Sequence, residues 1–211
     1  GTTPAEELLN FAPFDHEGHY LCFRDFYKND VRYVRELGWL TYHDGFWDKD
    51  LADRYLSIWI TDILRRRKEV AKKLGLKVPA SKLEASRANI EAIKAIARDR
   101  LVFRLADFNV ETHLLNCANG VLNLKTLELL PHDPKYFFNY KLSTKFNPES
   151  DCSNWNQFAG DCVGEDAADF KADMTALELL QLCAGYSITG ATSAETMFYI
   201  LGKIFEFHLN K

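Results

Sequence analysis

The chain lacks any apolar run that approaches the ~18 to 20 residues a helix needs to span a bilayer. Its first residues, GTTPAEELLN, lack the basic and apolar regions of a secretory signal. Its five cysteines are scattered and never follow the C-x-x-C spacing, which argues against a disulfide scaffold and a zinc ribbon. We therefore expect buried thiols in a reducing compartment, no membrane partner and a cytoplasmic location.

Motifs for nucleotide hydrolysis and acyl transfer are also missing. A P-loop needs G-x-x-x-x-G-K followed by Ser or Thr, so that backbone N–H groups wrap the phosphates and the hydroxyl reaches magnesium. The chain offers only Leu201-Gly202-Lys203-Ile204, preceded by Met197 where the first glycine belongs. No G-x-S-x-G motif is present, and the carboxylates are too dispersed to nominate an acid/base pair. We expect neither catalysis nor a cofactor or metal in this chain, although the alternative of a primase or nuclease stays open.

What is present is the composition of a folded soluble protein, with 211 residues of which 47% are hydrophobic and 27% charged. The formal net charge of -4 is distributed unevenly along the chain. Residues 61–104 hold 13 Lys and Arg against 5 Asp and Glu, whereas residues 151–195 hold 8 Asp and Glu against one Lys. The basic stretch is therefore the strongest candidate for a functional surface.

A basic surface can follow a phosphate backbone, because each neutralised phosphate releases condensed counterions. Two alternatives stay open: the Lys and Arg side chains simply solvate the outer faces of two helices, or they contact an acidic neighbour in an assembly. The candidate DNA-binding residues are Arg65, Arg66, Arg67, Lys68, Lys72 and Lys73, supported by Arg87, Lys94 and Arg98.

The first part of the chain combines helical and β patterns. Apolar spacing predicts a helix within residues 15–29, followed by short strands at 31–34 and 38–42. An Asp-Gly pair then turns the chain into Phe46-Trp47, which indicates a small β-meander. The aromatic cluster from Trp39 to Trp47 either forms the buried face of this meander or stacks unpaired bases, and we favour the core.

The basic stretch itself shows helical periodicity. Asp48 or Asp50 is expected to cap a long helix that stops at Gly75. Ser81 and Glu84 fit a capping box for a second helix. The apolar stripe of that helix is Ile90, Ile93, Ala97 and Leu101.

The pattern turns to β after residue 112. An Asn-Gly pair at 119–120 between apolar runs predicts a hairpin, followed by a strand near 127–130. Two helices are expected at 153–163 and 166–184, and a buried strand at 197–201.

The fold class is therefore α+β, predominantly helical, with small antiparallel β elements. The expected division has an N-terminal part at 1–108 with the meander and basic helices, and a second part at 109–202 with the hairpin and C-terminal helices. Residues 203–211 form an atypical tail.

Three potential zinc ligands lie near one face of the first predicted helix. His16, His19 and Cys22 are spaced at i, i+3 and i+6, but no fourth ligand is evident nearby. We favour an ordinary polar helix start over a metal site.

The order of these motifs resembles the helicase-associated domain between the primase part and the superfamily 3 helicase motor of phage, plasmid and poxvirus primase-helicases. The resemblance spans about residues 15–202. It is carried by Gly38, Trp39, Asp44, Gly45 and Trp47, by Asn116, Asn119, Gly120, Leu122 and Leu124, by Pro131, His132, Pro134 and Trp155, and by Gly185, Tyr186, Thr189, Gly190 and Thr192.

The resemblance implies a non-catalytic accessory domain in the DNA replication of a mobile element, in the cytoplasm of a bacterial host cell. Single- or double-stranded DNA, the adjacent motor and primase domains and further copies of the full-length protein are the implied partners. ATP and magnesium would bind in the motor, whose P-loop should follow residues 197–201, where this chain continues KIFEFHLNK. The alternative implied role is an assembly collar that holds subunits in register without touching DNA.

Overall fold

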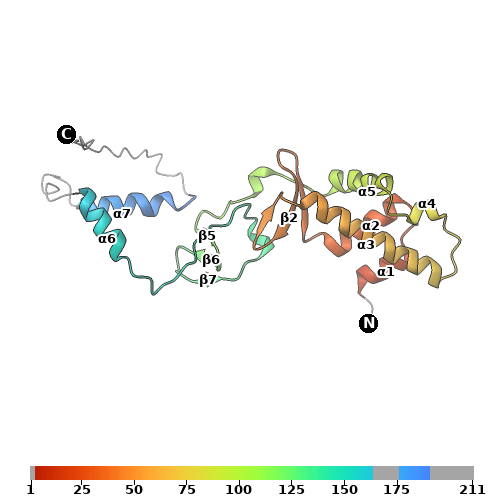
Figure 1. Cartoon of the computed structure of the whole chain (residues 1–211), viewed down its shortest axis with the longest axis horizontal. Helices are drawn as coiled ribbons and strands as arrows, with labels where there is room; N and C mark the ends of the chain where they lie inside the picture. The colour runs from red at the N-terminus through yellow and green to blue at the C-terminus, as the bar shows by residue number, and fades with distance from the viewer. Residues whose placement is uncertain (1–2, 164–175, 191–211) are drawn as a thin grey trace, which may run out of the picture. The chain divides into compact units, whose positions relative to one another are not determined.

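The structure is a computed structural model that describes residues 3–163 and 176–190 (Figure 1). The chain divides into two compact units, the first formed by residues 1–111 and 116–146, and the second by 112–115 and 147–211. This division differs from the boundary expected after residue 108, because residues 116–146 pack with the first unit. Each unit is described separately below.

Helices form one layer of the first unit, and α2, α3 and α5 contact one another (Figure 1). Their apolar faces meet in a core that includes Phe23, Leu56, Ile60, Ile93 and Ala97, all of which are fully buried. The predicted helices within 15–29 and up to Gly75, and the apolar stripe of the second basic helix, are confirmed. The helices are α1 (Pro4–Phe11), α2 (His16–Tyr27), α3 (Ala52–Lys73), α4 (Ala80–Leu83) and α5 (Arg87–Arg100).

Two of the expected helix caps are wrong. The residue before α3 is Leu51, in the left-handed conformation at φ 62° with no side-chain cap, so neither Asp48 nor Asp50 caps this helix. Helix α5 begins after Ser86, whose hydroxyl accepts a hydrogen bond from the backbone N–H of Asn89 at 3.3 Å. The Ser81 pattern instead falls in the short helix α4, which Pro79 precedes.

A four-stranded sheet adjoins the helices, with the order β3-β2-β1-β4. Strands β1 (Val31–Val34), β2 (Gly38–His43) and β3 (Phe46–Asp48) form the predicted antiparallel meander. Strand β4 (Val102–Phe103) pairs in parallel with β1, a long-range contact that local patterns do not reveal. Trp47 is only 1% exposed, and it packs with Val34, Leu40 and Phe108 in a second core. The preference for a core role is therefore confirmed for Trp47. Trp39 and Tyr42 are partly buried against the two cores, and Phe46 belongs to neither.

The predicted hairpin follows at residues 114–123, and all of it except Leu114 and Leu115 belongs to the first unit. A three-stranded sheet has the order β5-β6-β7, formed by β5 (Leu114–Cys117), β6 (Gly120–Asn123) and β7 (Leu129–Leu130). A Cβ atom at Gly120 would lie 2.6 Å from the carbonyl oxygen of Leu130, so this turn position needs glycine. Two 3-10 helices, η1 (Leu105–Asp107) and η2 (Pro134–Tyr136), complete the unit.

Buried polar contacts tie this segment to the meander. The amide of Asn116, fully buried, donates to the carbonyl of Gly45 at 3.1 Å and to that of Tyr140 at 2.7 Å. Its side-chain oxygen accepts from Nδ1 of His132 at 3.1 Å. A Cβ at Gly45 would lie 2.8 Å from the His132 ring, so this position too requires glycine. We call these four residues the Asn116 joint, and three of them belong to the motifs that carry the family resemblance.

The second unit contains α6 (Ser153–Val163) and α7 (Ala176–Ser187). Helix α6 confirms the prediction for 153–163, and α7 agrees with the C-terminal part of the helix expected at 166–184. The backbone N–H of Gly190 donates to the carbonyl of Thr112 at 3.2 Å. Residues 164–175, the predicted strand at 197–201 and the tail at 203–211 lie outside the described residues.

Taken together, the described elements confirm the α+β class. No helix among the described residues is long and apolar enough to cross a bilayer. Cys22 and Cys117 are buried as expected, whereas Cys152 is exposed, so the expectation of uniformly buried thiols is wrong.

Candidate nucleic-acid interface

Helix α3 has two chemically different faces. Its buried face carries Leu56, Ile60, Ile63 and Leu64 at helical spacing and continues through Arg67 and Ala71. The opposite face of its C-terminal half carries the exposed side chains of Lys68, Lys72 and Lys73. A basic surface therefore exists, but it holds only part of the predicted set.

Arg67 is fully buried, so the prediction that it contacts DNA is wrong. Its guanidinium donates to the carbonyl of Leu9 at 2.5 Å, and to those of Ala12 and Pro13 at 2.6 Å each. Its Cζ atom lies 3.8 Å from the centre of the Phe14 ring. Burial lowers the pKa of this guanidinium, in keeping with a charge removed from water. Arg67 instead satisfies carbonyl groups at and beyond the end of α1, which have no partner within that helix.

Lys94 is also excluded from the surface, which corrects a second predicted contact. Its side chain is 5% exposed, and Nζ donates to Asp53 at 2.7 Å and to Glu91 at 3.4 Å. This cation is therefore engaged between α3 and α5, where it is unavailable to a phosphate.

Arg65 and Arg66 reach the surface, but a carboxylate already engages them. Both donate to Asp62, at 2.7 and 2.6 Å, and Arg65 also donates to Glu69 at 3.0 Å. Partial burial acts to raise the pKa of Asp62. The hydrogen bonds from the two arginines outweigh this effect and lower the pKa. A phosphate would have to compete with this ionised carboxylate, so we assign these arginines a secondary place.

The other predicted residues are exposed. Lys68, Lys72, Lys73, Arg87 and Arg98 have no ion pair within the part of the chain that the structure describes. They do not all lie together. Since Lys94 of α5 contacts Asp53 near the start of α3, Arg98 lies near that end of α3.

The rise of an α-helix separates Asp53 from Lys72 by about 28 Å along α3. The densest free positive charge is therefore at the C-terminal end of α3. We call Lys68, Lys72 and Lys73 the lysine surface. Lys77, in the connection that follows, is exposed as well and extends the surface. Lys77 belongs to the basic stretch at residues 61–104, but it was not included among the candidate DNA-binding residues. The high density of Lys and Arg in that stretch is the sequence signal that could have identified it.

The three potential zinc ligands have other roles. His16 Nε2 donates to the Asn89 side-chain oxygen at 2.9 Å, and His19 Nε2 donates to the carbonyl of Lys82 at 2.9 Å. Burial lowers the pKa of His19 to about 4, so this ring is neutral near pH 7. No metal-ligating cluster occurs among the described residues. Cys22 is fully buried, and its Sγ donates to the carbonyl of Leu8 at 3.5 Å.

Comparison with known families identifies the class of protein as the N-terminal accessory region of primase-helicases, which act in DNA replication. The family model described as D5 N-terminal like matches residues 21–164. The chain belongs to this family, and the resemblance seen in its sequence is confirmed. A comparison with curated proteins finds no match.

Proposed function

We propose that this domain binds the phosphate backbone of DNA without sequence preference, mainly through the lysine surface. The observation that carries the proposal is the contrast along α3. Arg65, Arg66 and Arg67 are engaged by carboxylates or carbonyls, whereas Lys68, Lys72 and Lys73 are exposed and carry no described ion pair. Glu69, which lies one helical turn before Lys72 and Lys73, pairs with Arg65 at 3.0 Å and not with these lysines.

Arg87 and Arg98 supply weaker, more distant contacts in this proposal. Within a full-length primase-helicase, the domain would hold a DNA strand beside the motor and so position the motor during replication. Three to four phosphate contacts give a salt dependence of log K with a slope of roughly -2 to -4. Tripling the salt from about 50 mM should therefore weaken binding by at least roughly tenfold.

Fluorescence anisotropy of labelled single- and double-stranded DNA across a salt series tests the proposal. The triple variant Lys68→Gln, Lys72→Gln and Lys73→Gln should bind all sequences more weakly and show a shallower salt slope. The matched control replaces with Gln the residues Lys49, Lys125 and Lys145, which are exposed lysines away from the C-terminal end of α3, and changes the net charge equally.

Equal losses in the two triple variants would refute a localised interface, and absence of binding near 50 mM salt would refute the proposal as a whole. An oligomer that dissociates in salt while DNA binding stays absent would favour the assembly collar instead. Sedimentation of the same samples distinguishes these outcomes.

A further inference from the structure

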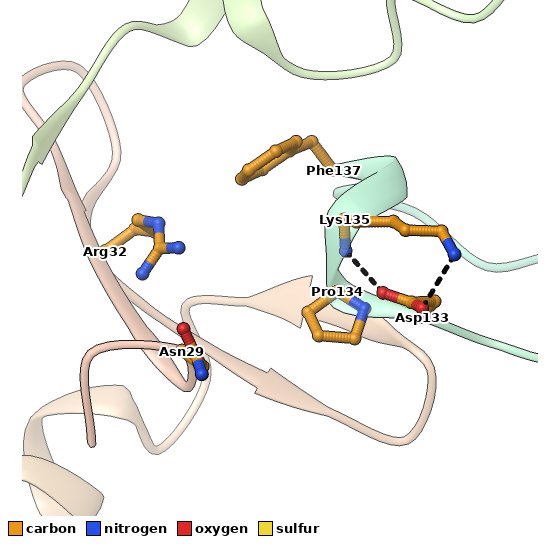
Figure 2. A pocket seen from close by; sticks show the side chains of 6 residues that line it. All are labelled: Asn29, Arg32, Asp133, Pro134, Lys135 and Phe137. Atoms are coloured by element: carbon orange, nitrogen blue, oxygen red, sulfur yellow. Dashed lines mark hydrogen bonds and ion pairs between the residues drawn. The ribbon is translucent and has the colours of Figure 1, made fainter. Parts of the chain in front are cut away.

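A cavity of about 330 Å³ lies in the first unit, between β1 and η2. Its walls are Asn29, Arg32, Pro134 and Phe137, with Asp133 and Lys135 at the side. Figure 2 shows Arg32 and Asn29 on one side and Pro134 and Phe137 on the other, with the Phe137 ring pointing toward Arg32. The volume suits a small ligand, since such sites occupy roughly 300 to 1,000 Å³.

The η2 side of the cavity is held firmly to the sheet. Trp47 donates from Nε1 to the carbonyl of Pro134 at 3.1 Å and from its backbone N–H to that of Phe138 at 2.7 Å. The N–H of Asn109 donates to the carbonyl of Phe137 at 3.1 Å. Phe137 itself has φ 50°, in the left-handed region that is uncommon for a residue with a side chain. The cavity is therefore a formed feature of the fold.

Arg32 has an unusual environment for an arginine. Its Cζ atom lies 4.9 Å from the ring centres of both Trp47 and Phe103, and Nη1 donates to the carbonyls of Lys28 and Val31. Its Nε atom is buried without a hydrogen-bond partner. Of the two amino groups of Arg32, only Nη1 has hydrogen-bond partners among the described residues, so Nη2 is the group that would donate to a ligand oxygen.

No carboxylate in the described residues forms an ion pair with Arg32. Asp30 is near enough to influence it electrostatically, but it is not within ion-pair distance. Burial raises the pKa of Asp30, and the charge of Arg32 acts against that shift. Lys135 is paired with Asp133 at 3.0 Å, and Figure 2 shows this pair turned away from Arg32. The free cation of the cavity is thus Arg32.

These groups combine one available guanidinium and one exposed amide with an aromatic ring and a proline. A guanidinium recognises a phosphate through several N–H donors at once, and the face of a ring packs against a base or sugar. The ring of Phe137 stacks on Phe103 and Trp47, with ring centres 4.9 and 6.1 Å apart, so only part of it lines the cavity. The geometry points to this cavity as a binding site for one nucleotide, with its phosphate on Arg32 and Asn29 and its base or sugar against Pro134 and the open part of Phe137. The nucleotide is either free or part of a DNA strand. The site is separate from the lysine surface and does not depend on it.

Titration of the full chain with thymidine 5′-monophosphate, followed by nuclear magnetic resonance, tests the site. The Nε–H signal of Arg32 and the side-chain amide of Asn29 should shift with this ligand and stay unchanged with thymidine. The variant Asn29→Asp should weaken binding by roughly tenfold, because it places a like charge beside the phosphate. The control Ser143→Asp adds the same charge at an exposed position outside the cavity and should leave binding unchanged.

Arg32→Gln should abolish the binding, with Arg35→Gln as the matched control on a nearby exposed arginine. Because Arg32 also packs on aromatic rings, the Asn29→Asp variant decides the question if Arg32→Gln fails to fold. A short oligothymidylate that shifts the same signals when the mononucleotide does not would support the site and identify its ligand as DNA.

Two results would overturn the assignment. The first is unshifted Arg32 and Asn29 signals with both ligands at millimolar concentration, and the second is inorganic phosphate that binds as tightly as the mononucleotide. Oligothymidylate that binds through the lysine surface but leaves Arg32 unshifted refutes only the cavity. A mononucleotide that shifts Arg32 in a chain that does not bind DNA refutes only the proposed function.

Discussion

Replacing Arg67 with methionine should destabilise the fold strongly. The change keeps an unbranched side chain of similar length but removes the donors that bind the carbonyls of Leu9, Ala12 and Pro13. Each buried carbonyl left without a partner costs about 1 to 3 kcal/mol. The variant also removes the cost of burying a charge, and the same burial lowers the pKa of Arg67. We expect a net loss of about 3 kcal/mol in the free energy of unfolding.

Urea denaturation followed by circular dichroism measures this loss. Lys68→Met is the matched control, because it removes one positive charge from the next, exposed position of the same helix. It should change the free energy of unfolding by less than about 0.5 kcal/mol while weakening DNA binding. Folded Arg67→Met protein should bind DNA as the unmodified chain does. A loss below about 1 kcal/mol for Arg67→Met, or an equal loss for Lys68→Met, would refute the structural role of Arg67.

Two further predictions concern the same helical layer. His19 has a folded-state pKa of about 4 against 6.5, so the unfolded chain binds its proton first and stability is lost as pH falls from 6.5 toward 4. Urea titrations should show that the free energy of unfolding of the unmodified chain falls by up to about 3 kcal/mol more than that of His19→Gln across this pH range. A difference between the two proteins that does not change with pH would contradict the burial of His19. Ser86→Ala should cost about 1 kcal/mol of unfolding free energy in urea, because Ser86 caps α5. Ser81→Ala should cost much less, and the reverse order would contradict this cap.

The local parts of the fold were predictable from the sequence. Apolar residues at helical spacing identified the core-facing sides of α3 and α5, and the Asp-Gly and Asn-Gly pairs identified two hairpin turns. The parallel pairing of β4 with β1 was missed, because it joins residues some 70 positions apart through a contact that no local pattern encodes. Neither Asp48 nor Asp50 caps α3, because the chain enters this helix through a left-handed Leu51.

The basic stretch does present exposed lysines at the C-terminal end of α3, but two residues of the candidate set, Arg67 and Lys94, are buried. Arg67 lies four residues before Ala71 and three after Leu64 on the apolar stripe of α3, and Lys94 lies between Ile90 and Ala97 on α5. That spacing was a signal of burial, which counting charges alone overlooked. The cavity beside Arg32 could not be foreseen, because β1 and η2 meet only in the folded chain.

The Asn116 joint determines how the chain can be shortened. A fragment cut after residue 108 would leave the carbonyl of Gly45 without its Asn116 donor, and Trp47 without the carbonyls of Pro134 and Phe138. Excision at that point therefore removes contacts that the meander needs, even though the meander lies wholly before the cut. An expression fragment meant to preserve the first unit has to extend to Phe146.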